Sequence, residues 1–285
     1  MDDRNPFSGP LVEVDWLVRH HQEVVLADVR WSVADGPKRD EFEHDHIPGA
    51  IFVDLDRDLS DPPGDRGRHP LPPVPTFRQT LHRLGLAGRP VVCYDDASGA
   101  VAARLWWMLR TLDLPAAVLN GGVEAWPGPW ESGPSRPPPA AEATPEADHG
   151  EDWPDHNVVT VDQVLSELQS GRILLDARST DRFEGRPNPI DSPAGHIPGA
   201  RSRPWTANIG DDGRLLSAVE LRRQFGQHGV KDSSIWMASC GSGVTACHNL
   251  LAADVAGLPG GRLYDGSWSE WIRDPTRPVI SEHSG

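Results

Sequence analysis

The stretch that decides the fold of this chain is Ser239-Cys240-Gly241-Ser242-Gly243-Val244-Thr245-Ala246-Cys247. An apolar run precedes it and a helix-forming run follows, so the pattern predicts a buried strand, a glycine-containing turn and a helix. Glycines in such a turn allow other groups to approach the backbone closely. The unpaired N–H groups at a helix start attract anions. The sequence therefore predicts a reactive thiolate at Cys240, although a cysteine taken at random is more often a buried apolar residue.

An internal repeat sets the domain organisation. The pentapeptide His-Ile-Pro-Gly-Ala occurs at residues 46–50 and again at 196–200, and similar pairs of segments lie upstream and downstream of it. Each copy is long enough to build its own core. We expect an N-terminal domain over residues 8–133, a Pro-rich linker over 134–155 and a C-terminal domain over 156–283.

Both copies alternate short apolar runs with amphipathic segments. In the second copy the expected strands cover 173–177, 235–238 and 262–264, and the expected helices 161–170, 218–227 and 244–253. In the first copy we expect, among others, a helix over 75–84 with Thr76 as its N-cap. Such alternation predicts an α/β fold, a mainly parallel sheet with helices on both faces. Ligands of these sheets bind at the carboxyl ends of the strands, where the Cys240 loop falls.

The heptapeptide Cys-Gly-Ser-Gly-Val-Thr-Ala that begins at Cys240 resembles the active-site loop of the rhodanese-type sulfurtransferases, and of the 3-mercaptopyruvate sulfurtransferase branch in particular. The resemblance implies that Cys240 carries sulfur as a persulfide, passed from a small anionic donor to cyanide or to a thiol such as thioredoxin or a low-molecular-weight dithiol. Thiosulfate-preferring rhodaneses usually carry basic residues in this loop, so 3-mercaptopyruvate is the expected donor and thiosulfate the alternative. Backbone N–H groups of the loop would hold the outer sulfur: Gly241, Ser242, Gly243, Val244 and Thr245.

Donor binding is assigned by the same resemblance. Arg182, in an Arg-Phe pair after a strand of the second copy, corresponds to the arginine that binds the donor's carboxylate. Guanidinium groups suit this role because they bind carboxylates with two parallel hydrogen bonds. The family's second carboxylate-binding arginine would fall at Asp191, so the chain departs from the pattern there. Arg186 is a candidate substitute.

A proton relay is also implied. In the 3-mercaptopyruvate branch an aspartate and a histidine from the first copy join the loop serine, which corresponds here to Asp56, His69 and Ser242. Cleavage of a carbon–sulfur bond leaves an enolate that needs a proton, which a hydroxyl backed by histidine can supply. An exposed loop histidine is the alternative for His69. His46 and His196 occupy the same position in the two copies, one of which is expected to be inactive, and this favours a structural role.

The first copy is expected to be inactive. Aligning Gly99 with Gly243 places Asp96 opposite Cys240, and an aspartate cannot accept sulfur. Cys93 lies within an apolar run and is expected to be an inert core residue.

Two other functional classes also use a cysteine in a loop of this kind. A rhodanese-like phosphatase needs Cys-x5-Arg, but the corresponding position is Ala246. A persulfide carrier or redox module without turnover stays possible, with Cys247 as a conceivable resolving thiol, although helix packing is its more common role. We expect no metal site and no cofactor, because the Cys247-His248 pair lacks the ligand spacing of zinc sites.

Composition limits the partners. The 285-residue chain has a net charge of −15, which argues against nucleic acid and anionic membranes as partners. Its three cysteines have no disulfide or zinc-site spacing, and the N-terminus lacks a signal-peptide pattern. We therefore expect a cytoplasmic enzyme without a transmembrane segment.

Overall fold

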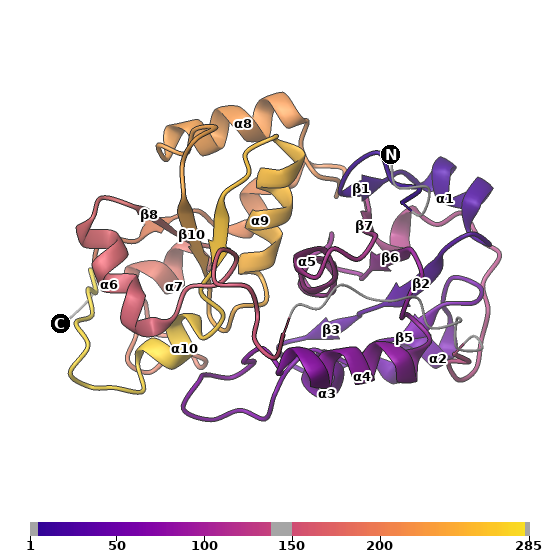
Figure 1. Ribbon diagram of the computed structural model, residues 1–285, viewed down its shortest axis with the longest axis horizontal. Coiled ribbons are helices and arrows are strands. Elements are labelled where there is room, and N and C mark those ends of the chain that lie inside the picture. The colour runs from indigo at the N-terminus through magenta and orange to yellow at the C-terminus, as the bar shows by residue number, and fades with distance from the viewer. Residues whose placement is uncertain (1–4, 138–149, 283–285) are drawn as a thin grey trace. The chain divides into compact units, whose positions relative to one another are not determined.

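The computed structural model describes residues 5–137 and 150–282 (Figure 1). The chain divides into two compact units. Unit 1 comprises the described residues up to Asp61 together with Pro72–Pro154 and Asp212–Arg214, and unit 2 comprises Pro62–Leu71, Asp155–Asp211 and the residues from Leu215 onward. A short segment of each sequence half thus belongs to the unit built mainly by the other half. Most of the expected linker lies outside the described residues.

Unit 1 contains a parallel five-stranded sheet of order β1-β7-β6-β2-β5. Its strands are β1 (Leu11–Val12), β2 (Val25–Asp28), β5 (Ile51–Phe52), β6 (Val91–Tyr94) and β7 (Ala116–Leu119). A small antiparallel pair is formed by β3 (Trp31–Ser32) and β4 (Gly36–Pro37). The helices are α1 (Val14–His20), α2 (Arg39–His44), α3 (Leu55–Asp58), α4 (Val74–Leu84), α5 (Ala102–Thr111) and the 3-10 helix η1 (Val123–Ala125).

Unit 2 contains a parallel four-stranded sheet of order β11-β10-β8-β9. Its strands are β8 (Ile173–Asp176), β9 (Arg201–Ser202), β10 (Trp236–Ser239) and β11 (Gly261–Leu263). The helices are α6 (Val161–Gln169), α7 (Thr180–Glu184), α8 (Ala218–Gln227), α9 (Ala246–Val255), α10 (Ser267–Trp271) and the 3-10 helix η2 (Trp205–Asn208). Figure 1 shows β8 and β10 between α6 on one side and α9 on the other.

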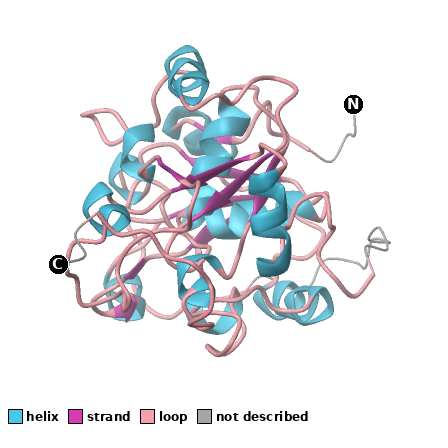
Figure 2. Cartoon of the chain, turned by 90° about the vertical axis from the view of Figure 1, so that its left-hand side faces the viewer, coloured by secondary structure: helices cyan, strands magenta, loops and turns pink. Residues whose placement is uncertain are grey.

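Alternate strand residues explain why helices cover both faces. In unit 2, Leu174 and Met237 join a core cluster with Val164 of α6 and Trp268 of α10. Leu175 and Ala238, which alternate with them, are equally buried, and α9 packs against β10 and β11 from the other side. Strands buried on both faces read as continuous apolar runs, which is the pattern of the sequence. Figure 2 shows the same layering, with strands enclosed by helices and loops. The predicted α/β class is confirmed.

The repeated histidine motif has a structural role in each unit. His46 stacks on Phe42 at 3.9 Å between ring centroids, and its Nδ1 lies 2.7 Å from the Phe42 carbonyl oxygen. His196 stacks on Phe183 at 3.8 Å, with its Nδ1 2.8 Å from the Phe183 carbonyl oxygen. Each buried imidazole therefore ties the motif to a helix of its own unit, as its occurrence in both copies suggests.

Two local predictions are wrong. Helix α4 begins at Val74 with Pro73 as its N-cap residue, so Thr76 lies inside the helix. Proline is favoured near a helix start because the first N–H groups of a helix have no partner within it, and proline has no N–H group. The residue opposite Cys240 is Asp95 rather than Asp96, because Tyr94 pairs with Asp28 in unit 1 as Ser239 pairs with Asp176 in unit 2. The conclusion that an aspartate replaces the cysteine is unchanged.

Candidate active site

Cys240 is the first residue after β10, at the carboxyl end of the sheet of unit 2. Its N–H donates to Ser267 Oγ at 3.0 Å, and its carbonyl oxygen accepts the Trp268 N–H at 3.1 Å. Both partners belong to α10. The Ser242 N–H lies 3.5 Å from Cys240 Sγ, within reach of a weak hydrogen bond. Helix α10 therefore fixes the backbone of Cys240, and one N–H group of the loop points toward its sulfur.

Two glycines of the loop serve different steric needs. Gly243 has φ +78°, and a side chain there would collide with the Asp265 carbonyl group. A Cβ on Gly241 would lie 2.8 Å from a guanidinium nitrogen of Arg182 and 2.8 Å from one of Arg68. Gly243 thus permits the turn, whereas Gly241 leaves room for two cationic groups next to Cys240.

His69 lies beside the loop serine. Its Nδ1 is 2.8 Å from Ser242 Oγ, and both residues belong to unit 2. Asp56, the expected third member of a relay, belongs to unit 1, where it lies in α3 and its Oδ2 accepts the indole N–H of Trp31 at 3.2 Å. The structure thus brings together the histidine and the serine of the predicted relay.

Arg182 and Asp191 form a bidentate ion pair. Arg182 Nε and Nη2 donate to the two Asp191 carboxylate oxygens at 2.8 and 2.9 Å. Arg178 Nη1 also reaches Asp191, at 3.4 Å, while its other nitrogens bond Asp176. Burial opposes ionisation of Asp191, but the arginines outweigh it and hold the pKa of this carboxyl below its usual range. Asp191 therefore anchors the arginine that the resemblance assigns to the donor.

Arg68 was missed by the sequence reasoning. One of its guanidinium nitrogens lies near Gly241, and its Nη1 is 3.8 Å from Asp191 Oδ1. Burial lowers the pKa of Arg68, and the negative charge of Asp191 opposes this shift. Its position next to His69 in the chain was the available signal. Arg186, by contrast, pairs with Asp181 at 3.1 Å and with Glu184 at 3.4 Å, and 56% of its side chain is exposed.

The equivalent loop of unit 1 is occupied by its own carboxylate. Asp95, fully buried, accepts four backbone N–H groups at 2.8–2.9 Å. Oδ1 accepts from Ala97 and Gly99, and Oδ2 from Val101 and Ala102. The turn after the strand is therefore a nest of converging backbone donors that holds a carboxyl group; burial raises the pKa of Asp95, and the four hydrogen bonds oppose this shift.

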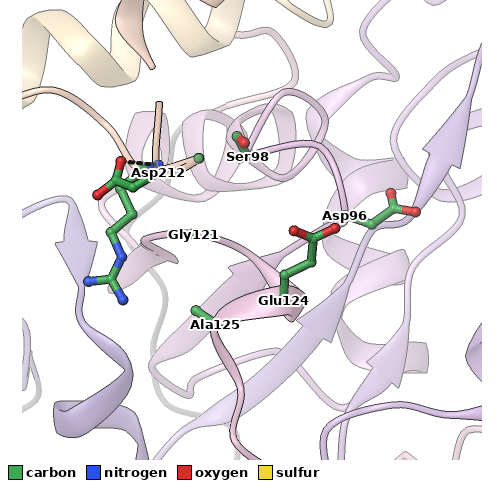
Figure 3. Close-up of a pocket in the computed structure, with 8 residues that line it drawn as sticks. Asp96, Ser98, Gly121, Glu124, Ala125 and Asp212 are labelled. Carbon is green, nitrogen blue, oxygen red and sulfur yellow. Dashed lines mark hydrogen bonds between the residues drawn. The ribbon is translucent and has the colours of Figure 1, made fainter. Parts of the chain in front are cut away.

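A pocket of about 220 Å³ lies beside this loop in unit 1 (Figure 3). Its charged lining consists of three carboxylates and one guanidinium, and Arg214 pairs with Glu13 at 3.0 Å. The carboxylates belong to Asp96, Glu124 and Asp212. Such a lining repels an anionic sulfur donor, so this pocket does not compete with the Cys240 loop as a candidate active site.

The other cysteines are buried. Burial raises the pKa of the Cys93 thiol, which disfavours a thiolate in the middle of β6. Cys247 lies in α9, and its Sγ is 3.4 Å from the Gly243 carbonyl oxygen. Within the described residues no group of three or more His, Cys, Asp or Glu side chains is placed to hold a metal ion. In the same part of the chain, no helix is both long and apolar enough to cross a membrane.

Comparisons with known proteins identify the family. The rhodanese-like domain family matches residues 13–128 and 160–274. A probable 3-mercaptopyruvate sulfurtransferase of Pseudomonas aeruginosa is 42% identical over 91% of this chain and 93% of its own length. A putative thiosulfate sulfurtransferase of Mycobacterium tuberculosis is 36% identical, with 94% of each chain covered. The structure of 3-mercaptopyruvate sulfurtransferase from Leishmania major has a TM-score of 0.83 and 36% identity, covering 96% of this chain and 77% of that one. The chain therefore belongs to the rhodanese family, as a tandem-domain sulfurtransferase of the 3-mercaptopyruvate sulfurtransferase branch.

Proposed function

We propose that this sulfurtransferase moves a sulfane sulfur from 3-mercaptopyruvate to a thiol or cyanide acceptor through a persulfide on Cys240. The observation that carries the choice of donor is the contact between His69 Nδ1 and Ser242 Oγ, at 2.8 Å, two residues from the cysteine. A donor whose carbon–sulfur bond is cleaved needs a proton at carbon, and a hydroxyl backed by an imidazole supplies one. Thiosulfate releases sulfite and has no such need.

In the first half-reaction, the Cys240 thiolate attacks the sulfur of the donor. A sulfur–sulfur bond forms, the carbon–sulfur bond breaks, and its electron pair leaves on carbon as the enolate of pyruvate. Ser242, backed by His69, delivers the proton that converts the enolate to pyruvate; Asp56 as the third relay member stays a prediction. Arg182 binds the carboxylate of the donor.

In the second half-reaction, an acceptor thiolate or cyanide attacks the outer sulfur and Cys240 leaves as thiolate. The backbone N–H groups of the loop hold the outer sulfur between the two steps: Gly241, Ser242, Gly243, Val244 and Thr245. Asp95 in unit 1 supports this assignment, because its carboxylate accepts backbone N–H groups of the equivalent turn.

The domain roles, the acceptor and the compartment are proposed from the sequence pattern and the family resemblance. We propose an inactive N-terminal domain over residues 8–133 and a catalytic domain over 156–283, with thioredoxin or a low-molecular-weight dithiol as acceptor in the cytoplasm. No resident cofactor is needed, since each half-reaction is a displacement at sulfur.

The test is kcat/KM for 3-mercaptopyruvate and for thiosulfate, each with cyanide and with a dithiol as acceptor. A preference for 3-mercaptopyruvate, lost together with the persulfide in a Cys240→Ser protein, supports the proposal. A Cys240→Ser protein that still transfers sulfur contradicts it. Preference for thiosulfate favours the second candidate function, thiosulfate:cyanide sulfurtransferase activity. This candidate stays open because Asp191 stands where the 3-mercaptopyruvate branch has its second carboxylate-binding arginine. Persulfide formation without turnover identifies a carrier.

A further inference from the structure

The segment Pro62–Leu71, which carries His69, belongs to unit 2 although it comes from the first half of the sequence. Its backbone is bonded to side chains in and next to α10. The Arg68 N–H donates to Ser269 Oγ at 3.0 Å, and the Leu71 N–H donates to Asp265 Oδ2 at 3.1 Å. His69 lies between these two attachment points, so its backbone is held on both sides.

Ser269, a buried residue of α10, contacts two backbone segments. Its N–H donates to the carbonyl oxygen of Gly241, in the Cys240 loop, at 2.9 Å. Its Oγ accepts the Arg68 N–H and donates to the Gly266 carbonyl oxygen at 3.1 Å. Ser269 therefore lies between the loop and the segment that carries the histidine, and it holds each of them by a hydrogen bond.

The segment can approach α10 this closely because residue 67 is a glycine. Gly67 has φ +100°, and a Cβ there would lie 2.7 Å from Ser269 Oγ and 2.9 Å from the Gly266 carbonyl oxygen. A larger residue would therefore push the segment away from its acceptor on α10. Gly64 pairs with Gly67 across a tight turn, but a Cβ on Gly64 would meet nothing within 4 Å. Gly67 is thus the point of contact, and Gly64 offers a matched control.

The contact between His69 and Ser242 tolerates little displacement. His69 Nδ1 lies 2.8 Å from Ser242 Oγ, inside the range of about 2.6–3.2 Å that proton transfer between side chains requires. A shift of about 1 Å takes the imidazole out of this range, and misplacements of that size cost enzymes about 100-fold in rate. The attachment of the segment to α10 therefore determines whether the imidazole can act.

We propose that Ser269 is a positioning residue. Its hydroxyl, with Gly67 at the point of contact, fixes His69 beside Ser242 and thereby favours donors whose leaving group needs a proton. This inference rests on the proposed function. Ser269 itself takes no part in the reaction and acts only through His69.

The test compares two donors in the full chain. We would measure the single-turnover rate of persulfide formation from 3-mercaptopyruvate and from thiosulfate. The variants are Ser269→Ala, which keeps the N–H bond to Gly241 but removes the acceptor of the segment, Gly67→Ala, and the control Gly64→Ala. Ser269→Ala is also combined with His69→Asn, because a residue that acts only through His69 has no effect once the imidazole is gone.

With 3-mercaptopyruvate, Ser269→Ala should lower the rate about 3- to 10-fold, as expected for the loss of one neutral hydrogen bond. Gly67→Ala should lower it about 10- to 100-fold, because the whole segment must move. With thiosulfate both rates should change by less than about twofold, since no proton is needed. Gly64→Ala should match the wild type, and adding Ser269→Ala to His69→Asn should cause no further loss. Equal losses with the two donors, or independent losses in the double variant, would overturn the proposal.

Amide hydrogen exchange separates this inference from the proposed function. Exchange over residues 67–71 should be about 3- to 10-fold faster in Ser269→Ala, with residues 240–245 unaffected. If the wild type fails to turn over 3-mercaptopyruvate but exchange changes as expected, the proposed function fails and the anchoring by Ser269 stands. If turnover depends on His69 while Ser269→Ala and Gly67→Ala match the wild type, the proposed function stands and the positioning role is wrong.

Discussion

The turns after β6 and β10 share one backbone contact but differ in the side chain of their first residue and in the charged groups around them. In each, the first loop residue accepts an N–H at its carbonyl oxygen from the later turn of its unit: Asp95 from Val123, and Cys240 from Trp268. The Asp95 side chain fills its nest with a carboxylate bound by four backbone N–H groups. Cys240 places a single sulfur there, reached by the Ser242 N–H at 3.5 Å.

The comparison teaches where a persulfide would lie. An aspartate oxygen is three bonds from Cα, and the outer sulfur of a cysteine persulfide is also three bonds from Cα. Unit 1 therefore displays a carboxyl-filled form of the turn in which we propose that unit 2 holds the second sulfur. The two turns differ in the side chain of their first residue and by one residue in length, and in unit 1 the donors around this side chain come from the backbone that follows it.

The largest expected effect comes from placing the unit 1 side chain in unit 2. A Cys240→Asp protein should lose sulfur transfer by about 10⁴-fold or more, as enzymes do without their nucleophile. Its carboxylate should nevertheless occupy the nest and raise Tm by about 2–4 °C above that of Cys240→Ser. Activity assays and thermal unfolding of the two variants check this. A Cys240→Asp protein less stable than Cys240→Ser would show that the two turns are not equivalent.

Sequence reasoning predicted the repeat, the parallel sheets and the position of Cys240, because strand–helix alternation and a glycine-rich turn are local patterns. Arg68 and the anchoring role of Asp191 were not predictable in this way. The Pro-rich segment that carries Arg68 has no periodicity, and which unit it packs against depends on contacts with residues distant in sequence, such as Ser269. The alignment error of one position at Asp95 arose because the turn of unit 1 is one residue longer: four residues separate Tyr94 at the end of β6 from Gly99, whereas three separate Ser239 at the end of β10 from Gly243.

The second effect concerns the proton that distinguishes the two donors. His69→Asn keeps a polar group near Ser242 but removes the imidazole, so kcat with 3-mercaptopyruvate should fall about 100-fold. Persulfide formation from thiosulfate, whose leaving group needs no proton, should change by less than about threefold. Single-turnover measurements with both donors separate the outcomes. Equal losses with the two donors would assign His69 to the architecture of the loop rather than to proton transfer.

The third effect concerns the four hydrogen bonds that the Asp95 side chain accepts. Asp95→Asn replaces one acceptor oxygen by an NH₂ group that faces backbone donors, so unfolding should require about 2–4 kcal/mol less free energy. The specific activity of the folded protein should stay within about twofold of wild type, since the change lies in the other unit. Urea denaturation checks the first value and steady-state assays the second. Unaltered stability would mean that the four donors contribute little to holding the carboxylate.

The smallest expected effect concerns how close to the Cys240 turn a positive charge must lie to affect donor binding. Arg68 and Arg182 lie beside Gly241, whereas Arg186 is exposed and pairs with Asp181 and Glu184 on the surface of α7. Surface ion pairs of this kind contribute about 0–1 kcal/mol, and charges separated by water are screened. Arg186→Met should therefore change the KM for 3-mercaptopyruvate by less than about twofold at physiological ionic strength. A tenfold rise would instead assign Arg186 to the donor, and would require α7 to rearrange when the donor binds.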